Sequence, residues 1–376
     1  MTVGTGATAN QPVLQTISEF RTGLRAWLDA NDLTPAPDHS LDGQVVQLLR
    51  VRRALFDADW MRYGWPTEIG GLGGPAALRA VLGEEIATRD LAEPGIWSMI
   101  EVLAPTMISY APPALAARMV PLLLSGREQW CQGFSEPGSG SDLASLSTKA
   151  TLREQDWVIS GQKVWTSLAQ YAARCVLLTR TGPGHGGITA FFVDMDTPGI
   201  TVRPLRTMHG VDEFAEVFFD DVVVPGDRML GSPGDGWQIA MDLLPHERST
   251  CFWHRIAYLF TRLDQVLAQA DDHDDAALGA AYLALHTVRC RSLGTQRRLA
   301  DGDRLGPETS IDKVLLAGAE QQLFDLARDL LPGAVELDDG PWRTEFLYSR
   351  AATIYGGTAE IQRNIIARRL LDLGKD

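Results

Sequence analysis

The sequence contains few cysteines and no excess of basic residues. Its four cysteines lie far apart in the 376 residues and form no C-x-x-C pair. This spacing favours reduced thiols in the cytoplasm over a disulfide framework or a zinc site. The formal net charge is −14, from 34 Lys and Arg against 48 Asp and Glu. Such an acidic excess argues against general binding to nucleic acid or to an anionic membrane surface.

The sequence also lacks recognisable targeting and membrane-spanning segments. The first basic residue is Arg21, so no charged region precedes an apolar stretch, and we expect no signal peptide. The longest apolar stretches, such as residues 276–288, are too short and too interrupted to cross a bilayer. We therefore expect a cytoplasmic protein that does not associate with membranes.

Several common catalytic motifs are missing. No G-x-x-x-x-G-K-[ST] occurs, and no G-x-G-x-x-G follows a strand with an acidic residue downstream, so neither a P-loop nor a nicotinamide-binding fingerprint is present. The seven histidines show no H-E-x-x-H spacing. Pro137 stands where a nucleophile elbow around Ser135 would need glycine. Nothing therefore indicates a hydrolase or a metalloenzyme.

The pattern of apolar residues changes twice along the chain. With 45% hydrophobic residues, the chain can bury a large core. Helical spacing, as in Phe20, Leu24 and Leu28, dominates up to about residue 125, and it returns after Gly236. Short β-rich runs broken by Gly, Pro and Asp lie between. The order predicts an α+β multi-domain protein: an N-terminal helical domain (1–125), a small central β-barrel or sandwich domain (126–232) and a C-terminal helical bundle (233–376).

Two polar segments of the central region could hold a ligand. In Gly133–Asp142, glycines allow backbone N–H groups to approach a ligand, and serines supply hydroxyl donors. In Gly161–Ser167, Trp165 places an aromatic plane beside a hydroxyl, which suits a planar heterocycle held by one face and one edge. Alternatively, the first segment is only a polar loop and Trp165 is a core aromatic of the β domain.

Seven segments, in order along most of the chain, resemble the acyl-CoA dehydrogenase family of flavoproteins. They are Gly64–Pro66 with Gly70–Gly73, Leu82–Glu85, Ser135–Asp142, Gly161–Ser167, Phe218–Pro225, Leu230–Gly231 with Gly236, and Gly357–Arg363. The resemblance implies an N-terminal helical domain, a central β domain and a C-terminal four-helix bundle. This agrees with the helix, strand, helix order read independently from the apolar pattern.

The resemblance implies FAD, held between the β domain and the bundle. By position, Phe134 and Ser135 would contact the isoalloxazine, Trp165 would stack beside it and Ser167 would bond its edge. The signature that contains Gly140 and Ser141 would contact the cofactor, and Ser141 also the thioester. Two further residues match positions near the pyrophosphate, where a helix N-terminus favours negative charge. These are Thr358 and Glu360, and the Glu360 side chain is expected to point away from the anion.

The resemblance also implies removal of an α-proton from an acyl-CoA thioester and transfer of the β-hydrogen as hydride to the flavin. The proton needs a carboxylate base within reach. Most of the family place a glutamate where this sequence has Gly356. Some members place it on the first bundle helix, where this sequence has Glu247 followed by Arg248. Glu247 is therefore the candidate base, and the Gly356 backbone N–H could donate to the thioester oxygen.

Alternatives remain for these residues. Glu247 could be a dipole-compensating surface group early in a helix, or it could form a structural ion pair with Arg248. Arg248 is also a candidate for binding CoA phosphates, because guanidinium groups pair with phosphate in a bidentate way. Tyr355 is expected near the thioester, although a packed aromatic of the bundle would look the same in sequence.

A second departure from the family concerns its assembly. Homotetrameric members carry Arg-x-x-Phe-Gly and Gln-x-x-Gly-Gly segments that reach the neighbouring subunit's FAD, whereas this sequence reads Val288–Gly294 and Leu330–Ala334 in that region. In this respect it resembles bacterial steroid side-chain dehydrogenases built from two different subunits. The resemblance therefore implies a homo- or hetero-oligomer, with a paralogous partner completing the FAD site.

The leading functional prediction is an FAD-dependent acyl-CoA dehydrogenase that passes electrons to an electron-transferring flavoprotein. One alternative is a non-catalytic or half-site subunit that completes the site of a partner. Another is a flavin oxidase or monooxygenase on the same fold, or an enzyme acting on acyl groups tethered to a carrier protein.

Overall fold

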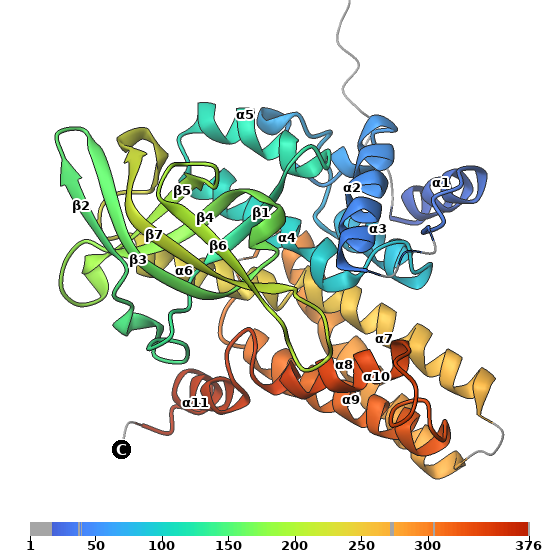
Figure 1. Ribbon diagram of the computed structural model, residues 1–376. Helices are drawn as coiled ribbons and strands as arrows, with labels where there is room; N and C mark the ends of the chain where they lie inside the picture. Colours follow the sequence, from blue (N-terminus) through green and yellow to red (C-terminus); the bar gives the residue numbers. More distant parts are fainter. Residues whose placement is uncertain (1–16, 37, 39, 271–273, 304, 375–376) are drawn as a thin grey trace, which may run out of the picture.

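The computed structural model describes residues 17–36, 38, 40–270, 274–303 and 305–374. The start of the chain, on which the expectation of no signal peptide rests, lies outside these residues. Helices form the first and last thirds, and strands form the middle third (Figure 1). The three-part α+β architecture predicted from the sequence is confirmed. The predicted boundaries after residues 125 and 232 fall in the connections α5–β1 and β8–α6.

The N-terminal helices are α1 (Ile17–Ala30), α2 (Leu41–Asp57), α3 (Ala77–Thr88), α4 (Pro94–Tyr110) and α5 (Pro113–Leu124). Side-chain caps begin two of them: Ser40 accepts from Gly43 N at the start of α2, and Glu93 accepts from Ile96 N at the start of α4. Such caps satisfy backbone donors that have no partner within the helix. Most residues of α3 and the middle of α4 are buried, so these two helices lie inside the molecule.

The strands are β1 (Gln129–Gly133), β2 (Lys149–Arg153), β3 (Asp156–Ser167), β4 (Ala172–Arg180), β5 (Ile188–Asp194), β6 (Ile200–Leu205), β7 (Phe214–Pro225) and β8 (Met229–Leu230). They form one sheet in the order β6-β7-β3-β2-β4-β5-β8, with β1 beside β4. The pairing of β1 with β4 is parallel, whereas β3 and β7 run antiparallel. The loop that leaves β1 lies beside β3.

The C-terminal helices are α6 (Gly236–Glu247), α7 (Thr250–Gln269), α8 (Asp275–Ala300), α9 (Thr309–Leu330), α10 (Pro341–Ser349) and α11 (Ala359–Arg369). Apolar side chains of α7, α8 and α9 share one buried cluster. The last helix ends at Arg369. In the described part of the chain, no helix is both long and apolar enough to cross a membrane. That part also contains no group of three or more residues suited to holding a metal ion.

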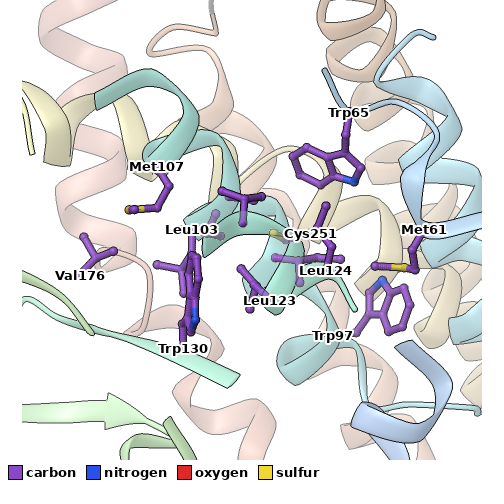
Figure 2. Close-up of a cluster of buried hydrophobic side chains, with 14 of the residues drawn as sticks. Met61, Trp65, Trp97, Leu103, Met107, Leu123, Leu124, Trp130, Val176 and Cys251 are labelled. Carbon is purple, nitrogen blue, oxygen red and sulfur yellow. The ribbon is translucent and has the colours of Figure 1, made fainter. Parts of the chain in front are cut away.

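One core cluster joins all three regions. Figure 2 shows Leu103 of α4 beside Trp130 of β1, with Val176 of β4 and Cys251 of α7 in the same cluster. Trp130 is fully buried, and its ring meets that of Phe192 edge to face at 4.8 Å. Because a packed interior resists local shifts, this cluster fixes the sheet relative to α4 and to the beginning of α7.

Shortening a side chain in this cluster should destabilise the whole protein. Leu103 is fully buried, so Leu103→Ala is expected to lower the free energy of unfolding by about 2–5 kcal/mol, through lost burial and a residual cavity. The matched control is Leu337→Ala, because Leu337 is 87% exposed; it should change stability by less than about 0.5 kcal/mol. Urea unfolding followed by circular dichroism measures both. Equal effects of the two substitutions would contradict the assignment of this core.

Candidate functional site

The polar loop after β1 is anchored to β3. The Lys163 ammonium donates to the Phe134 carbonyl at 3.0 Å and pairs with Glu136 Oε1 at 2.8 Å. Val164 N donates to the Ser135 carbonyl at 3.0 Å. The Lys163 side chain is fully buried, and that of Glu136 is 5% exposed. The chain segment that includes Phe134 and Ser135 is therefore held at a fixed place beside the strand that carries Trp165.

Glu136 also binds the far end of the loop. Its carboxylate accepts from Ser147 N at 2.7 Å, from Ser147 Oγ at 2.7 Å and from Thr148 N at 2.8 Å. Burial opposes ionisation of this carboxyl, but the charge and hydrogen bond of Lys163 and the bonds from Thr148 and Ser147 outweigh it. Together they lower the pKa of Glu136 to about 2. The carboxylate is thus ionised at neutral pH and closes the loop around residues 137–146.

Next to this anchored loop lies a set of groups with unused binding capacity. Trp165 is 60% exposed, has a φ of +60°, and touches Phe214 edge to face with ring centres 5.9 Å apart. The hydroxyls of Ser135, Ser141 and Ser167 make no hydrogen bond with any described residue. The space beside Gly140 is also open among these residues. An exposed aromatic face with free hydroxyls fits a planar, polar-edged ligand. Trp165 is thus not the core aromatic of the alternative interpretation.

The second half of the site is a turn in the C-terminal region. Gly356 and Gly357 have φ values of +62° and +90°, which glycine adopts at no steric cost. A Cβ atom at Gly356 would lie 2.6 Å from Glu247 Oε1 and 3.8 Å from Lys313 Nζ. The Glu247 carboxylate therefore occupies the space that a side chain at residue 356 would enter. The structure brings together the two positions that the sequence offered for the base.

The position of Glu247 differs from both structural alternatives. It is the last residue of α6 rather than an early one, so its charge lies at the helix end where the dipole disfavours an anion. No ion pair joins Glu247 to Arg248 within the described residues. Instead, Arg248 Nη2 donates to the Gly356 carbonyl at 3.1 Å. A half-buried carboxylate placed against the helix dipole and without an ion pair is typical of a functional group rather than a stabilising one.

Other side chains hold the turn. Gln362 is fully buried, and its Nε2 donates to the carbonyls of Gly356 at 3.3 Å and Gly357 at 3.2 Å. Tyr355 is half-buried and lies beside Tyr348, with ring centres 5.9 Å apart. Burial raises the pKa of the Tyr355 hydroxyl well above its usual value, so the phenol is neutral. Arg248 is 6% exposed, and its Nε has no partner among the described residues.

The start of α11 has the geometry of an anion site. Thr358 is the N-cap residue, and its hydroxyl accepts from Ile361 N at 3.2 Å. The Glu360 side chain is 77% exposed and lies 3.8 Å from Arg363. It therefore extends into solvent along the helix surface, which leaves the backbone N–H groups of Ala359 and Glu360 available to an anion.

Sequence reasoning gave no role to Lys313, which lies close to both glutamate positions. This residue is 3% exposed and lies on the same buried face of α9 as Leu316, Glu320 and Leu323. The available signal was a charged residue in register with the buried face of a helix, which is uncommon unless the charge has a partner. The groups that compensate the charge of Lys313 lie on other elements, so the sequence of α9 alone does not identify them.

Family models match nearly the whole described chain. Residues 15–127 match the acyl-CoA dehydrogenase N-terminal domain, 131–222 the middle domain and 234–371 the C-terminal domain. The chain belongs to the acyl-CoA dehydrogenase family. Members of this family are flavoproteins that use FAD, and this chain is an oxidoreductase of the acyl-CoA dehydrogenase type.

Individual relatives agree with this family. Acyl-CoA dehydrogenase IpdE1 of Mycobacterium tuberculosis is 38% identical over 385 residues, covering 96% of this chain and 99% of that protein. The human mitochondrial short-chain specific acyl-CoA dehydrogenase is 30% identical, covering 81% of this chain and 78% of that protein. A chain in the crystal structure of the ChsE4–ChsE5 complex from Mycobacterium tuberculosis has a TM-score of 0.81 at 26% identity, covering 99% of this chain and all of that one.

The Glu136–Lys163 pair should make this dehydrogenase sensitive to acid. The folded-state pKa of Glu136, about 2, lies below the unfolded value of 4.5, so the ionised Glu136 carboxylate contributes about 3 kcal/mol above pH 4.5. That contribution is lost as the pH falls from 4.5 towards 2. Glu136→Gln should therefore lower the free energy of unfolding at pH 7 by about 3 kcal/mol or more and flatten its decline in acid. Urea unfolding between pH 7 and pH 3 measures both effects.

The matched control for this prediction is Glu360→Gln, which removes an exposed carboxylate. Its unfolding free energy should follow that of the unmodified protein at every pH. If Glu136→Gln behaves like this control, the buried pair does not stabilise the loop.

Proposed function

We propose that the chain catalyses α,β-dehydrogenation of an acyl-CoA thioester, with Glu247 as the base that removes the α-proton. The observation that carries this proposal is the 2.6 Å separation between Glu247 Oε1 and the position of a Cβ at Gly356. The family's usual base extends from that backbone position, and here a carboxylate from α6 fills the space. The catalytic group has thus moved to a different helix while its place in the site is kept.

FAD fits the groups beside β3. The exposed face of Trp165 can lie against a ring system, and the Ser135 and Ser167 hydroxyls can bond its polar edge. Phe134 would border the same ring, and the open loop at Gly140 and Ser141 leaves room for the rest of the cofactor. The start of α11, at Thr358, suits the pyrophosphate, with Glu360 turned to solvent. When bound, FAD supplies the hydride acceptor for the β-hydrogen.

The chain's own residues account for the handling of the proton and of the charge that develops. Glu247 takes the α-proton, and the negative charge that forms on the thioester oxygen needs a donor. The Gly356 N–H has no acceptor among the described residues, so it is free to serve as that donor. Arg248 fixes the same residue through its carbonyl, and Tyr355 borders the turn as a neutral phenol. Ser141 and Arg248 are the proposed contacts to the CoA thioester.

Replacing the base tests this proposal. Glu247→Gln keeps the shape of the side chain but cannot accept a proton, so kcat with acyl-CoA should fall by about 10²–10⁴-fold. The flavin absorbance of the purified protein should not change, because Glu247 lies in the other half of the site. Stopped-flow bleaching of the flavin on mixing with acyl-CoA measures the step directly. Asp339→Asn removes a carboxylate whose side chain is 97% exposed and that lies outside the proposed site, so it is the control and should keep its activity.

Unchanged turnover in Glu247→Gln would remove the proposed base. Consumption of oxygen during turnover, in place of reduction of an electron-transferring flavoprotein, would instead favour the oxidase alternative.

We further propose that a paralogous subunit completes the FAD site. The segments that reach the neighbouring FAD in homotetramers are absent from α8 and from the end of α9, and two arginines of α8 are engaged within the chain. Arg289 pairs with Glu84 at 2.7 Å, and Arg291 pairs with Asp312 at 2.7 Å. The similar fold of a chain in the ChsE4–ChsE5 complex supports an assembly of two different chains.

Co-expression tests this assembly. The chain purified alone should carry less than one FAD per subunit, and co-expression with a paralogue encoded beside it should raise FAD to a stoichiometric level and give turnover. Flavin absorbance, subunit mass by light scattering and reduction of an electron-transferring flavoprotein measure the outcome. A chain that alone binds one FAD per subunit and turns over acyl-CoA would contradict the proposal.

A further inference from the structure

Lys313 is a buried cation beside the proposed base. The chain contains only four lysines, and among those that the structure describes, Lys313 is one of two whose side chains are almost fully buried. It projects from α9 towards the turn at Gly356. A buried ammonium group costs free energy unless other groups compensate its charge. The identity of those groups therefore indicates why the charge is there.

The ammonium group contacts the segment that leads into the Gly356 turn and faces the Glu247 carboxylate. Its Nζ donates to the Ala352 carbonyl at 2.8 Å and lies 3.9 Å from the centre of the Tyr355 ring. Nζ is also 3.8 Å from the position of a Cβ at Gly356, the same point that lies 2.6 Å from Glu247 Oε1. One cation thus contacts the segment that leads into the turn and faces the carboxylate that fills the turn.

We propose that Lys313 is a positioning residue that holds the Tyr355–Gly357 turn in place and presents a positive charge to the Glu247 carboxylate that fills this turn. This inference rests on the proposed function, because it assigns Lys313 a role towards the same base. The hydrogen bond to Ala352 and the contact with Tyr355 give the mechanical part of the role. The positive charge near Glu247 gives the electrostatic part, since an opposite charge favours the ionised form of a carboxyl.

The charged groups around this pair come from several elements. Glu247 faces Lys313 and Arg248, and it also interacts with the Cys251 thiol of α7 and the Tyr355 phenol. Lys313 is further influenced by Glu320, about two turns along α9. Of these groups, Lys313 and Arg248 are the cations. Arg248 donates through Nη2 to the Gly356 carbonyl.

The protonation of Lys313 falls within an accessible pH range. Burial lowers the pKa of the Lys313 ammonium to about 8, although Glu247 and Glu320 raise it and Arg248 lowers it further. Below that pH the group is a cation, and above it the charge beside Glu247 is lost. At neutral pH Lys313 is therefore a cation that faces Glu247.

Direct titration of the lysines tests the coupling without relying on activity. The full chain labelled with [ε-¹³C]lysine should give four NMR signals, which Lys→Arg variants assign. In the unmodified protein the Lys313 signal should titrate near pH 8. In Glu247→Gln its midpoint should fall, because the carboxylate that favours the ammonium is gone. In the control Glu360→Gln the midpoint should not move. An unchanged Lys313 midpoint in Glu247→Gln would overturn the proposal.

The pH profile of the co-expressed holoenzyme provides a second test. Lys313→Met keeps much of the apolar stem but removes the charge, so the acidic limb of kcat/KM should move up by about one pH unit, a tenfold loss at acidic pH. Lys313→Arg should restore the acidic limb because it keeps the charge. A Lys313→Met profile that superimposes on that of the unmodified enzyme would refute the electrostatic role.

The two proposals fail in different ways. If Glu247→Gln turns over at full rate, the proposed base is wrong whatever Lys313 does. If Glu247→Gln is inactive but neither the Lys313 midpoint nor the Lys313→Met profile changes as described, only the role of Lys313 is wrong. Should Lys313→Met not fold, the NMR comparison of the unmodified protein with Glu247→Gln still decides the question, because it leaves Lys313 in place.

Discussion

The absence of a side chain at Gly356 is the constraint on which the candidate active site depends. The backbone there has a positive φ, and a Cβ atom would collide with the Glu247 carboxylate. Glycine therefore serves two purposes: it allows the turn, and it makes room for a carboxylate that arrives from α6. A family that usually places its base at this position can move the base to another helix only if the original position gives up its side chain.

The two halves of the site are organised by similar means. In the β domain, buried Lys163 binds Glu136 and the Phe134 carbonyl and so fixes the loop that faces Trp165. In the bundle, buried Lys313 binds the Ala352 carbonyl and faces Glu247. A compact, strongly hydrated ammonium group is costly to bury. Each lysine therefore favours the backbone conformation that supplies it with an oxygen acceptor. The loop after β1 and the turn at Gly356, which are not regular secondary structure, are thereby each held in one conformation.

Much of this arrangement could be predicted from the sequence, but for different reasons in different places. Helices with one apolar stripe, such as α1 and α7, are visible in the spacing of their residues. Helix α4 is not, because it is buried on most sides and its apolar residues show no single face. The candidate base at Glu247 came from the resemblance to a family, since a Glu-Arg pair has no distinctive pattern. Lys313 could not be predicted, because its partners lie on α6 and in the turn after α10, and only the folded chain brings them together.

The orientation of the bundle, and with it the position of Glu247, depends on charges far from the site. Glu84 of α3 accepts from Arg21 of α1, from Trp253 Nε1 of α7 and from Arg289 of α8. One buried carboxylate thus ties α1 and α3 of the N-terminal region to α7 and α8 of the bundle. Burial opposes ionisation of Glu84, but its arginine partners outweigh burial and lower its pKa, so the charge persists. Since α7 begins three residues after Glu247, a shift of α7 relative to α3 would move the carboxylate away from Gly356, and the distant network is therefore part of what positions the proposed base.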